Sequence, residues 1–403
     1  MTKQSFLSVD TESQLNHYCQ HLINHPDITW IAIDTEFVRE DTYYPELSLI
    51  QIQDSLGELA IIDPLKIQES SIQVDRKDAL AAFIELLCDP NTLKVFHSAR
   101  QDLEVLYQLA QKMPVSIFDT QIATLFLKLG EMAGFARVIQ TTLGITIDKS
   151  QTRTNWHARP LTEAQIEYAL DDVRYLAPLY QHCLNHLSPE ELKAVNEECE
   201  ALLDASLYKI DPSTAGAKLK GIKGFKPKQL AIAYALAEWR ETFAMSHNQP
   251  KKWVMSDEVI IQIAKRPPKT VDALYKVPHI KASSIMSHGE TWIALIDRVF
   301  EQPPEQWPQP ASKVSAATAQ EEAVIQLLNG YAQQVAVDYR LNLPSLLQRN
   351  DTLAVLRNQP PEKPLFSGWR NLLIGQPILA LLKGKKSLTI VDNQVVFTQG
   401  KTQ

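Results

Sequence analysis

The chain has 403 residues, enough for two or three domains, and its 45% hydrophobic and 22% charged residues are typical of a soluble globular protein. Its longest nearly apolar run, residues 372–382, is too short to cross a bilayer, and the polar first residues lack the apolar core of a signal peptide, so we expect no membrane association. The four cysteines have no Cys-x-x-Cys spacing, which argues against a disulfide framework or a zinc site and favours free thiols in a cytoplasmic protein.

The net charge of −7 is unevenly distributed along the chain. Residues 1–208 contain 15 Lys and Arg against 31 Asp and Glu, a net charge of −16, whereas residues 209–298 contain 15 against 8, a net charge of +7. This pattern predicts a carboxylate-rich catalytic domain next to a cationic domain that binds a polyanion. A chance imbalance between solvated surfaces is the alternative explanation.

The first half of the chain predicts an α/β domain with a mixed sheet. Alternating and buried apolar patterns predict short strands at 30–37, 47–53, 58–62, 93–97 and 115–118. Helical periodicity predicts helices at 10–26, 76–88, 100–111, 119–129, 134–143, 162–186 and 187–205. A meander of strands followed by alternating helices and strands indicates a sheet that is covered by helices.

The second half is predicted to be almost entirely helical. Helices are expected after the basic segment 218–228, at 229–247, 256–264, 270–275, 287–300, 320–337, 344–357 and 367–382, with a short β-like tail at 388–397. A segment rich in Pro, Gln and Ala separates the two helical groups and predicts a linker. We therefore predict domains at 1–205, 206–303 and 320–403, with the linker at 304–319.

The predicted strand 30–37 contains two carboxylates, Asp34 and Glu36, one residue apart. Side chains at i and i+2 of a strand lie on the same face, so the two carboxylates point together. Like charges raise each other's pKa unless a cation lies between them, and hard oxygen ligands suit Mg²⁺ or Mn²⁺. An isolated Asp-x-Glu is more often an acidic turn, so the hypothesis depends on further carboxylates elsewhere in the chain.

Two predicted helices supply these further acids. Asp102 lies near the start of helix 100–111, a position that the helix dipole alone also favours. Tyr168 and Asp172 are four residues apart and share a helix face, whereas Asp171 lies on another face and is interpreted as a bystander. Four carboxylates can hold two divalent metal ions, Mg²⁺ or Mn²⁺, for hydrolysis of a phosphodiester. Tyr168 is suited to orienting the attacking water, because its phenol ionises far above neutral pH.

In combination, these motifs resemble the ribonuclease D family of DEDDy-class 3′→5′ exonucleases, which have an RNase H-like (DnaQ-like) fold. The matching segments are Ile33–Phe37, Thr42–Pro45, Val95–Val105, Asn155–Thr162 and Tyr168–Leu176. All the catalytic residues of the family are present in order: Asp34, Glu36, Asp102, Tyr168 and Asp172. The resemblance implies metal-dependent removal of 5′-mononucleotides from the 3′ ends of RNA, typically tRNA precursors.

The resemblance extends to the basic middle of the chain. Residues 229–300 are similar to the HRDC domain shared by ribonuclease D and RecQ-type helicases, through Ala237–Arg240, Trp253–Asp257 and Ala264–Pro268. That module binds nucleic acid, in agreement with the positive charge. Residues 316–386 are interpreted as a diverged second copy. The expected fold is therefore an α/β RNase H-like exonuclease domain followed by two small all-α HRDC-like domains, with no protein partner inferred.

Five residues near the motifs are candidates for substrate binding: Phe37, His97, Gln101, Arg153 and Trp156. Phe37 can stack on the terminal base, or it can belong to the core. His97 and Gln101 can contact the substrate strand, or they can complete the hydrogen bonds of their loop. The arginine and tryptophan, with Arg159, form a basic and aromatic group suited to phosphates.

Other functions fit the sequence less well. The active-site residues do not choose between RNA and DNA, so a DNA-directed or general 3′→5′ exonuclease is the first alternative, although the HRDC-like region argues against it. A non-catalytic nucleic-acid-binding module is the second alternative, and the intact set of catalytic residues argues against that. A helicase is excluded, because the chain has no Gly-x4-Gly-Lys-Ser/Thr loop.

Overall fold

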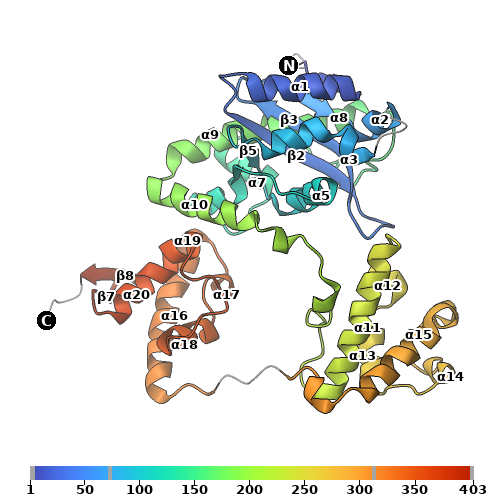
Figure 1. Cartoon of the computed structure of the whole chain (residues 1–403). Coiled ribbons are helices and arrows are strands. Elements are labelled where there is room, and N and C mark those ends of the chain that lie inside the picture. The colour runs from blue at the N-terminus through green and yellow to red at the C-terminus, as the bar shows by residue number, and fades with distance from the viewer. Residues whose placement is uncertain (1–4, 71–74, 311–314, 400–403) are drawn as a thin grey trace. The chain divides into compact units, whose positions relative to one another are not determined.

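The computed structural model describes residues 5–70, 75–310 and 315–399 (Figure 1). The chain divides into two compact units. Unit 1 comprises 1–38, 47–208 and 314–403, and unit 2 comprises 39–46 and 209–313. The predicted linker at 304–319 lies partly outside the described residues, which omit 311–314. No helix within the described ranges combines the length and the apolar character that a membrane crossing requires.

The centre of unit 1 is a six-stranded sheet in the order β1-β4-β3-β2-β5-β6. The strands are β1 (Leu7–Val9), β2 (Trp30–Val38), β3 (Glu46–Asp54), β4 (Leu59–Ile62), β5 (Leu93–Phe96) and β6 (Ile117–Asp119). β3 and β4 are antiparallel, while β1 with β4, β2 with β5, and β5 with β6 are parallel. The sheet is therefore mixed, which confirms the predicted fold class. β1 was not predicted, because three residues carry no periodic signal.

Helices cover this sheet, as Figure 1 shows for α1, α5, α8 and α9. They are α1 (Glu12–Asn24), α2 (Pro64–Ser70), α3 (Arg76–Ala79), α4 (Ala81–Cys88), α5 (Arg100–Ala110), α6 (Thr120–Phe126), α7 (Phe135–Leu143), α8 (Glu163–Arg174), α9 (Leu176–His186) and α10 (Pro189–Leu202). The single helix predicted at 162–186 is wrong, since α8 and α9 meet at Tyr175. Pro178 explains the break, because proline lacks the N–H that would bond to the carbonyl of Arg174.

The last part of unit 1 is helical and ends in a hairpin. It contains α16 (Ala319–Tyr339), α17 (Leu343–Leu346), α18 (Arg349–Leu356), α19 (Gly368–Arg370), a π-helical turn (Asn371–Gly375), α20 (Gln376–Leu382) and the antiparallel strands β7 (Lys386–Val391) and β8 (Gln394–Gln399). The hairpin corresponds to the predicted β-like tail, so this region is not all-α. Buried side chains of α16, such as Leu328 and Ala332, belong to the same hydrophobic core as the sheet.

A specific contact attaches this last region to α10. The backbone N–H of Gly368 donates to a carboxylate oxygen of Glu197 at 2.9 Å. Gly368 has a φ of +53°, and a Cβ at this position would collide with the carboxyl group of Glu198. Glycine is therefore required by both the backbone conformation and the close approach.

Unit 2 is a helical domain together with one segment from the start of the chain. Its helices are α11 (Pro227–Ser246), α12 (Lys251–Val254), α13 (Asp257–Lys265), α14 (Val271–Leu274) and α15 (Ala282–Glu301), packed around a fully buried Trp292. Segment 39–46 joins them through Tyr43, whose hydroxyl donates to Glu241 and whose backbone N–H donates to the side-chain oxygen of Asn248 at 3.1 Å.

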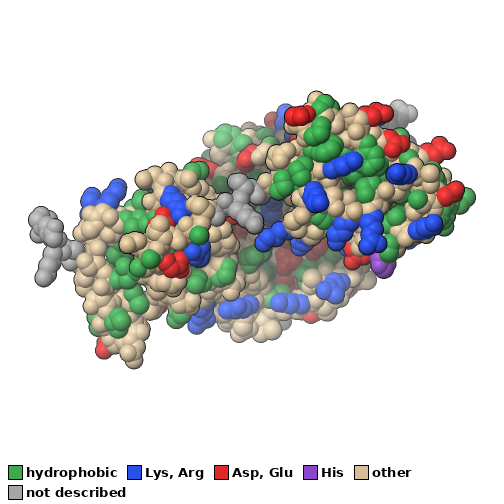
Figure 2. All heavy atoms as spheres, turned by 90° about the horizontal axis from the view of Figure 1, so that it is seen from below, with side chains coloured by type: hydrophobic (Ala, Val, Ile, Leu, Met, Phe, Trp, Pro, Cys, Tyr) green, Lys and Arg blue, Asp and Glu red, His purple; other side chains and the backbone are tan. Residues whose placement is uncertain are grey.

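Lysine and arginine side chains cover parts of the protein surface. Many Lys and Arg side chains are exposed on the face that Figure 2 shows. In unit 2, exposed lysines mark the segment that leads into α11, namely Lys218, Lys220, Lys223, Lys226 and Lys228. The positive charge counted from the sequence is thus exposed and available to an anionic ligand.

Candidate active site

Three carboxylates meet where β2 lies against α8. Asp34 and Glu36 extend from β2, and Asp172 extends from α8. One oxygen from each lies within 4.8 Å of the others, and all three side chains are partly buried. Since β2 alternates its side chains, the intervening Thr35 points to the other face and is buried. Strand geometry and one helix face thus bring together acids that are far apart in the sequence.

Asp102 lies next to this group of three. It sits in the first turn of α5 and is only 7% exposed. The hydroxyl of Thr35 donates to a carboxylate oxygen of Asp102 at 2.5 Å. This bond holds Asp102 against β2. Asp102 also lies close enough to Asp34, Glu36 and Asp172 for its charge to raise the pKa of each.

The pKa values of the four acids are all raised. Burial raises the pKa of Asp34 well above its usual range, and the charges of Asp172, Asp102 and Glu36 add to the effect. The pKa of Glu36 rises to about 9, through burial and then through Asp172 and Asp102. The pKa values of Asp102 and Asp172 rise to about 7, in both cases chiefly through burial.

No Lys, Arg or His within the described ranges forms an ion pair with Asp34, Glu36 or Asp172. Like charges that are partly buried and unpaired disfavour their own ionisation. A divalent cation between them would remove this penalty, because hard carboxylate oxygens are its preferred ligands. The donor set therefore fits Mg²⁺ or Mn²⁺.

Tyr168 lies one turn before Asp172 on α8. Its hydroxyl lies 3.3 Å from the hydroxyl of Thr152, and its ring packs 6.0 Å from that of Trp156. Burial, and then the charge of Asp172, raise the pKa of the Tyr168 phenol above its usual value. The phenol therefore keeps its proton at neutral pH and can donate a hydrogen bond.

Asp171, the neighbour of Asp172, has a different environment. The guanidinium of Arg174 pairs with the carboxylate of Asp171 and lies 3.5 Å from that of Glu167. Asp171 is thus compensated by a cation on its own helix, whereas Asp172 faces other acids. The two adjacent residues form a natural pair for mutagenesis.

The five candidate substrate-binding residues have varied environments. Both ring nitrogens of His97 form contacts within the protein, to the hydroxyl of Thr120 at 2.9 Å and the carbonyl of Ala133 at 3.0 Å. Phe37 is half-buried against the core, and Trp156 is 3% exposed. By contrast, two candidates are exposed, namely Gln101 and Arg153.

Arg159 also has partners within the protein. Its guanidinium forms two bonds to Asp63, at 2.6 and 2.9 Å, and one to the carbonyl of Ser48 at 2.8 Å. These bonds attach the loop before α8 to the ends of β3 and β4. Arg159 therefore stabilises the fold around the site.

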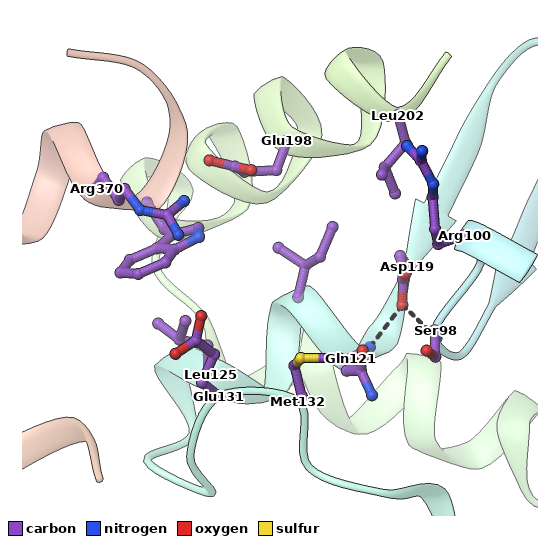
Figure 3. Close-up of a pocket in the computed structure, with 12 residues that line it drawn as sticks. Ser98, Arg100, Asp119, Gln121, Leu125, Glu131, Met132, Glu198, Leu202 and Arg370 are labelled. Atoms are coloured by element: carbon purple, nitrogen blue, oxygen red, sulfur yellow. Dashed lines mark hydrogen bonds between the residues drawn. The ribbon is translucent and has the colours of Figure 1, made fainter. Parts of the chain in front are cut away.

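Sequence reasoning missed Asp119, the last residue of β6. Its buried carboxylate accepts the backbone N–H groups of Ser98, Ala99 and Gln121 at 2.8 to 2.9 Å. Figure 3 shows Asp119 between Ser98 and Gln121, at the edge of a hollow of about 260 Å³ whose walls include Arg370. Asp119 thus fixes the turn that begins α5 and thereby places Asp102. An Asp directly before a helix is a capping signal that the sequence contained.

Comparisons with known proteins agree with this arrangement. A family model described as 3′-5′ exonuclease matches residues 6–188, and one described as HRDC domain matches residues 229–296. The ribonuclease D of Zymomonas mobilis is 32% identical over 92% of this chain and 93% of its own length. The ribonuclease D of Shewanella sp. is 35% identical over 74% of each chain. The crystal structure of Escherichia coli RNase D, described as an exoribonuclease involved in structured RNA processing, has a TM-score of 0.79 at 29% identity and covers 94% of this chain and 99% of that one.

Proposed function

The chain belongs to the ribonuclease D family, and from this premise we propose that it is a metal-dependent 3′–5′ exoribonuclease that releases 5′-mononucleotides. The observation that carries the proposal is the group of unpaired carboxylates at Asp34, Glu36 and Asp172. Structural acids are normally paired with cations or hydrogen-bond donors, whereas this group repels itself. A cationic ligand relieves this repulsion, and hydrolysis of a phosphodiester is a reaction that divalent cations support.

We assign the metal ligands to Asp34, Glu36, Asp102 and Asp172, which would hold two Mg²⁺ or Mn²⁺ ions. Bound divalent ions would lower the pKa of the attacking water and stabilise the charge that develops on the phosphate oxygens. Thr35 contributes by holding the carboxylate of Asp102 in place. The pKa values of about 7 to 9 at Asp102, Asp172 and Glu36 indicate that ligand binding releases protons from the site.

Tyr168 is assigned to orienting the attacking water. Its phenol lies close enough to Asp172, Glu36 and Asp34 for their charges to affect its pKa, and it remains protonated at neutral pH. A protonated phenol donates a hydrogen bond that fixes the water in line with the scissile bond. It does not serve as a base at this pH.

Unit 2 is assigned to RNA binding, because its HRDC domain is basic and an acidic active site repels the RNA backbone. The family resemblance favours the 3′ trailer of tRNA precursors as the substrate. The four free cysteines fit activity in the cytoplasm.

The test uses a 3′-extended tRNA and a matched DNA strand, each labelled at the 5′ end. Each is incubated with Mg²⁺, Mn²⁺ or EDTA, and the products are resolved by length. We expect metal-dependent shortening of the RNA from its 3′ end that stops near the mature terminus. Equal trimming of DNA indicates a general exonuclease, and no trimming with either metal leaves only a binding function.

A further inference from the structure

Three aromatic side chains are stacked in a row along the last turns of α11 in unit 2 and the residue that follows it, His247. Trp239 and Phe243 have ring centroids 5.4 Å apart with an interplanar angle of 29°. Phe243 and His247 are 3.9 Å apart and nearly parallel, with an angle of 16°. His288 of α15 stands edge-on to the row, 5.3 Å from Trp239 and 4.7 Å from Phe243. These four residues are called the ring stack below.

The ring stack runs from the core of unit 2 to its surface. At the inner end, Trp239 contacts Trp292, which is fully buried. At the outer end, His247 is exposed, and no further ring within the described ranges covers its outer face. A nitrogen of the His247 ring lies 3.0 Å from the carbonyl oxygen of Phe243, which fixes the orientation of the ring. The stack therefore presents a preorganised aromatic face to solvent.

A cation on the same face of α11 as the ring stack, and the positive charge of the region, favour an anionic partner. Lys228 lies about three turns before Trp239 on the same face of α11. Its ammonium group lies 3.8 Å from the centre of the Phe300 ring at the far end of α15. Residues 209–298 carry a net charge of +7. Aromatic faces combined with a cationic surface are the features with which proteins bind single-stranded nucleic acid.

We propose that the ring stack is a binding site for unpaired bases of single-stranded RNA, in which a base stacks on the outer face of His247. The inference rests on the proposed exoribonuclease function, which supplies RNA as the ligand, and adds where and how unit 2 holds it. Stacking is tolerant of sequence because every base has a π-face, which suits an enzyme that trims varied RNA ends. The lysines contact phosphates and supply the salt-dependent part of the affinity.

The test measures dissociation constants by fluorescence anisotropy, with the full chain carrying Asp172→Asn so that the RNA is not trimmed. The ligands are a short labelled oligoadenylate and an abasic oligomer of the same length. We expect His247→Ala to weaken oligoadenylate binding by about fivefold to a hundredfold and to leave binding of the abasic oligomer unchanged. His247→Phe keeps an aromatic ring and is expected to retain the preference for bases.

Tyr275→Ala is the matched control, because Tyr275 is a 54% exposed aromatic residue of the same unit that lies outside the ring stack. It is expected to leave both affinities unchanged. The proposal is overturned if oligoadenylate and the abasic oligomer bind equally well, or if His247→Ala leaves the preference intact. Trimming of the 3′-extended tRNA by the unaltered chain is measured in parallel. If the unaltered chain trims the RNA but His247→Ala binds like the parent, the ring stack is not the binding site and the proposed function stands. If the unaltered chain does not trim the RNA, the proposed function is wrong.

Discussion

Residues 1–208 and 209–298 contain the same number of Lys and Arg, 15 each, and differ in their acids, of which the first has 31 and the second 8. Their buried charges differ as well. In unit 2, the buried Arg240 pairs with Asp257 at 2.6 Å, and the buried Glu241 pairs with Lys251 at 3.2 Å. Unit 1 also has such a pair, Asp63 with Arg159, but in addition its Asp34, Glu36 and Asp172 converge on one another. A buried charge that is paired with an opposite charge supports the fold. Partly buried like charges that lack an opposite charge indicate a ligand-binding site.

The largest expected effect comes from removing one of the unpaired acids. Asp34→Asn is expected to lower the trimming rate by about 10³-fold, because several kcal/mol of charge stabilisation correspond to about three powers of ten. The melting temperature in EDTA should stay the same or rise, since the substitution removes a repelling charge. Single-turnover kinetics and a thermal melt measure the two effects.

Asp27→Asn is the matched control for Asp34→Asn, because Asp27 is an exposed acid of the same unit. It is expected to change neither quantity. A wild-type trimming rate for Asp34→Asn would remove this residue from the catalytic site and undermine the contrast between paired and unpaired acids.

Tyr168→Phe tests whether the Tyr168 hydroxyl orients the attacking water. Loss of the phenol hydroxyl removes the proposed hydrogen bond to the attacking water, and we expect the trimming rate to fall about 10- to 100-fold. The affinity for RNA should not change, since the ring remains. An unchanged rate, or an equal loss in binding, would show that the hydroxyl does not orient the water.

The next prediction concerns the basic unit 2 and removes the positive charge of the segment before α11. Changing Lys218, Lys220, Lys223 and Lys226 to Gln is expected to weaken RNA binding about tenfold at moderate salt and to flatten its salt dependence, by about 0.7 in the slope for each phosphate that a lysine no longer neutralises. Hydrolysis of a dinucleotide should be unaffected. A dinucleotide rate that falls together with RNA affinity would mean that the segment supports the fold.

This substitution is a better test than truncation. The sequence alone predicts that removing everything after about residue 205 weakens RNA binding more than hydrolysis of a very short substrate. The structure shows that such a truncation also removes α16 and α19, which share the core of unit 1, and that α19 bonds to α10. The truncated chain would expose this core, so a loss of activity would not report on RNA binding.

The smallest expected effect is on stability as a function of pH. In the folded protein without metal, the pKa is about 9 for Glu36 and about 7 for Asp102 and Asp172. Ordinary carboxyl groups of an unfolded chain have pKa values of about 4. The unfolded chain therefore releases these protons first as the pH rises, and stability present below about pH 4 is lost progressively up to about pH 9.

Melting temperatures in EDTA across this range measure the effect, and Glu36→Gln should reduce the slope. Added Mg²⁺ should stabilise the protein more at pH 8 than at pH 6, because protons compete with the metal. A slope of the opposite sign, or one unchanged by Glu36→Gln, would contradict the electrostatic description of the site.

Local rules predicted much of the geometry of the candidate site. The period of two along β2 places Asp34 and Glu36 on one face, and the four-residue spacing on α8 places Tyr168 beside Asp172. The mixed sheet and the helical second half followed from periodicity as well. The break between α8 and α9 was missed because the apolar pattern continues through it, although Pro178 was a visible signal.

Contacts between residues far apart in the sequence could not be predicted from local patterns. The backbone N–H of Gly368 bonds to Glu197, which lies 171 residues earlier, and no local pattern indicates that pairing. The same is true of Tyr43 and Glu241, which attach segment 39–46 to unit 2. The hydrogen bond from Thr35 to Asp102 could likewise not be predicted, because an alternating strand only indicates that Thr35 points away from its acidic neighbours.

The most direct test compares two adjacent aspartates on α8. Asp172 joins the unpaired acids, whereas Asp171 pairs with Arg174, so Asn at either position changes the same charge in different surroundings. Single-turnover trimming of a 3′-extended RNA with Mg²⁺ is measured for both variants. We expect Asp172→Asn to reduce the rate by about 10³-fold and Asp171→Asn to stay within about threefold of the unaltered protein. A wild-type rate for Asp172→Asn together with a large loss for Asp171→Asn would contradict the assignment of the catalytic site.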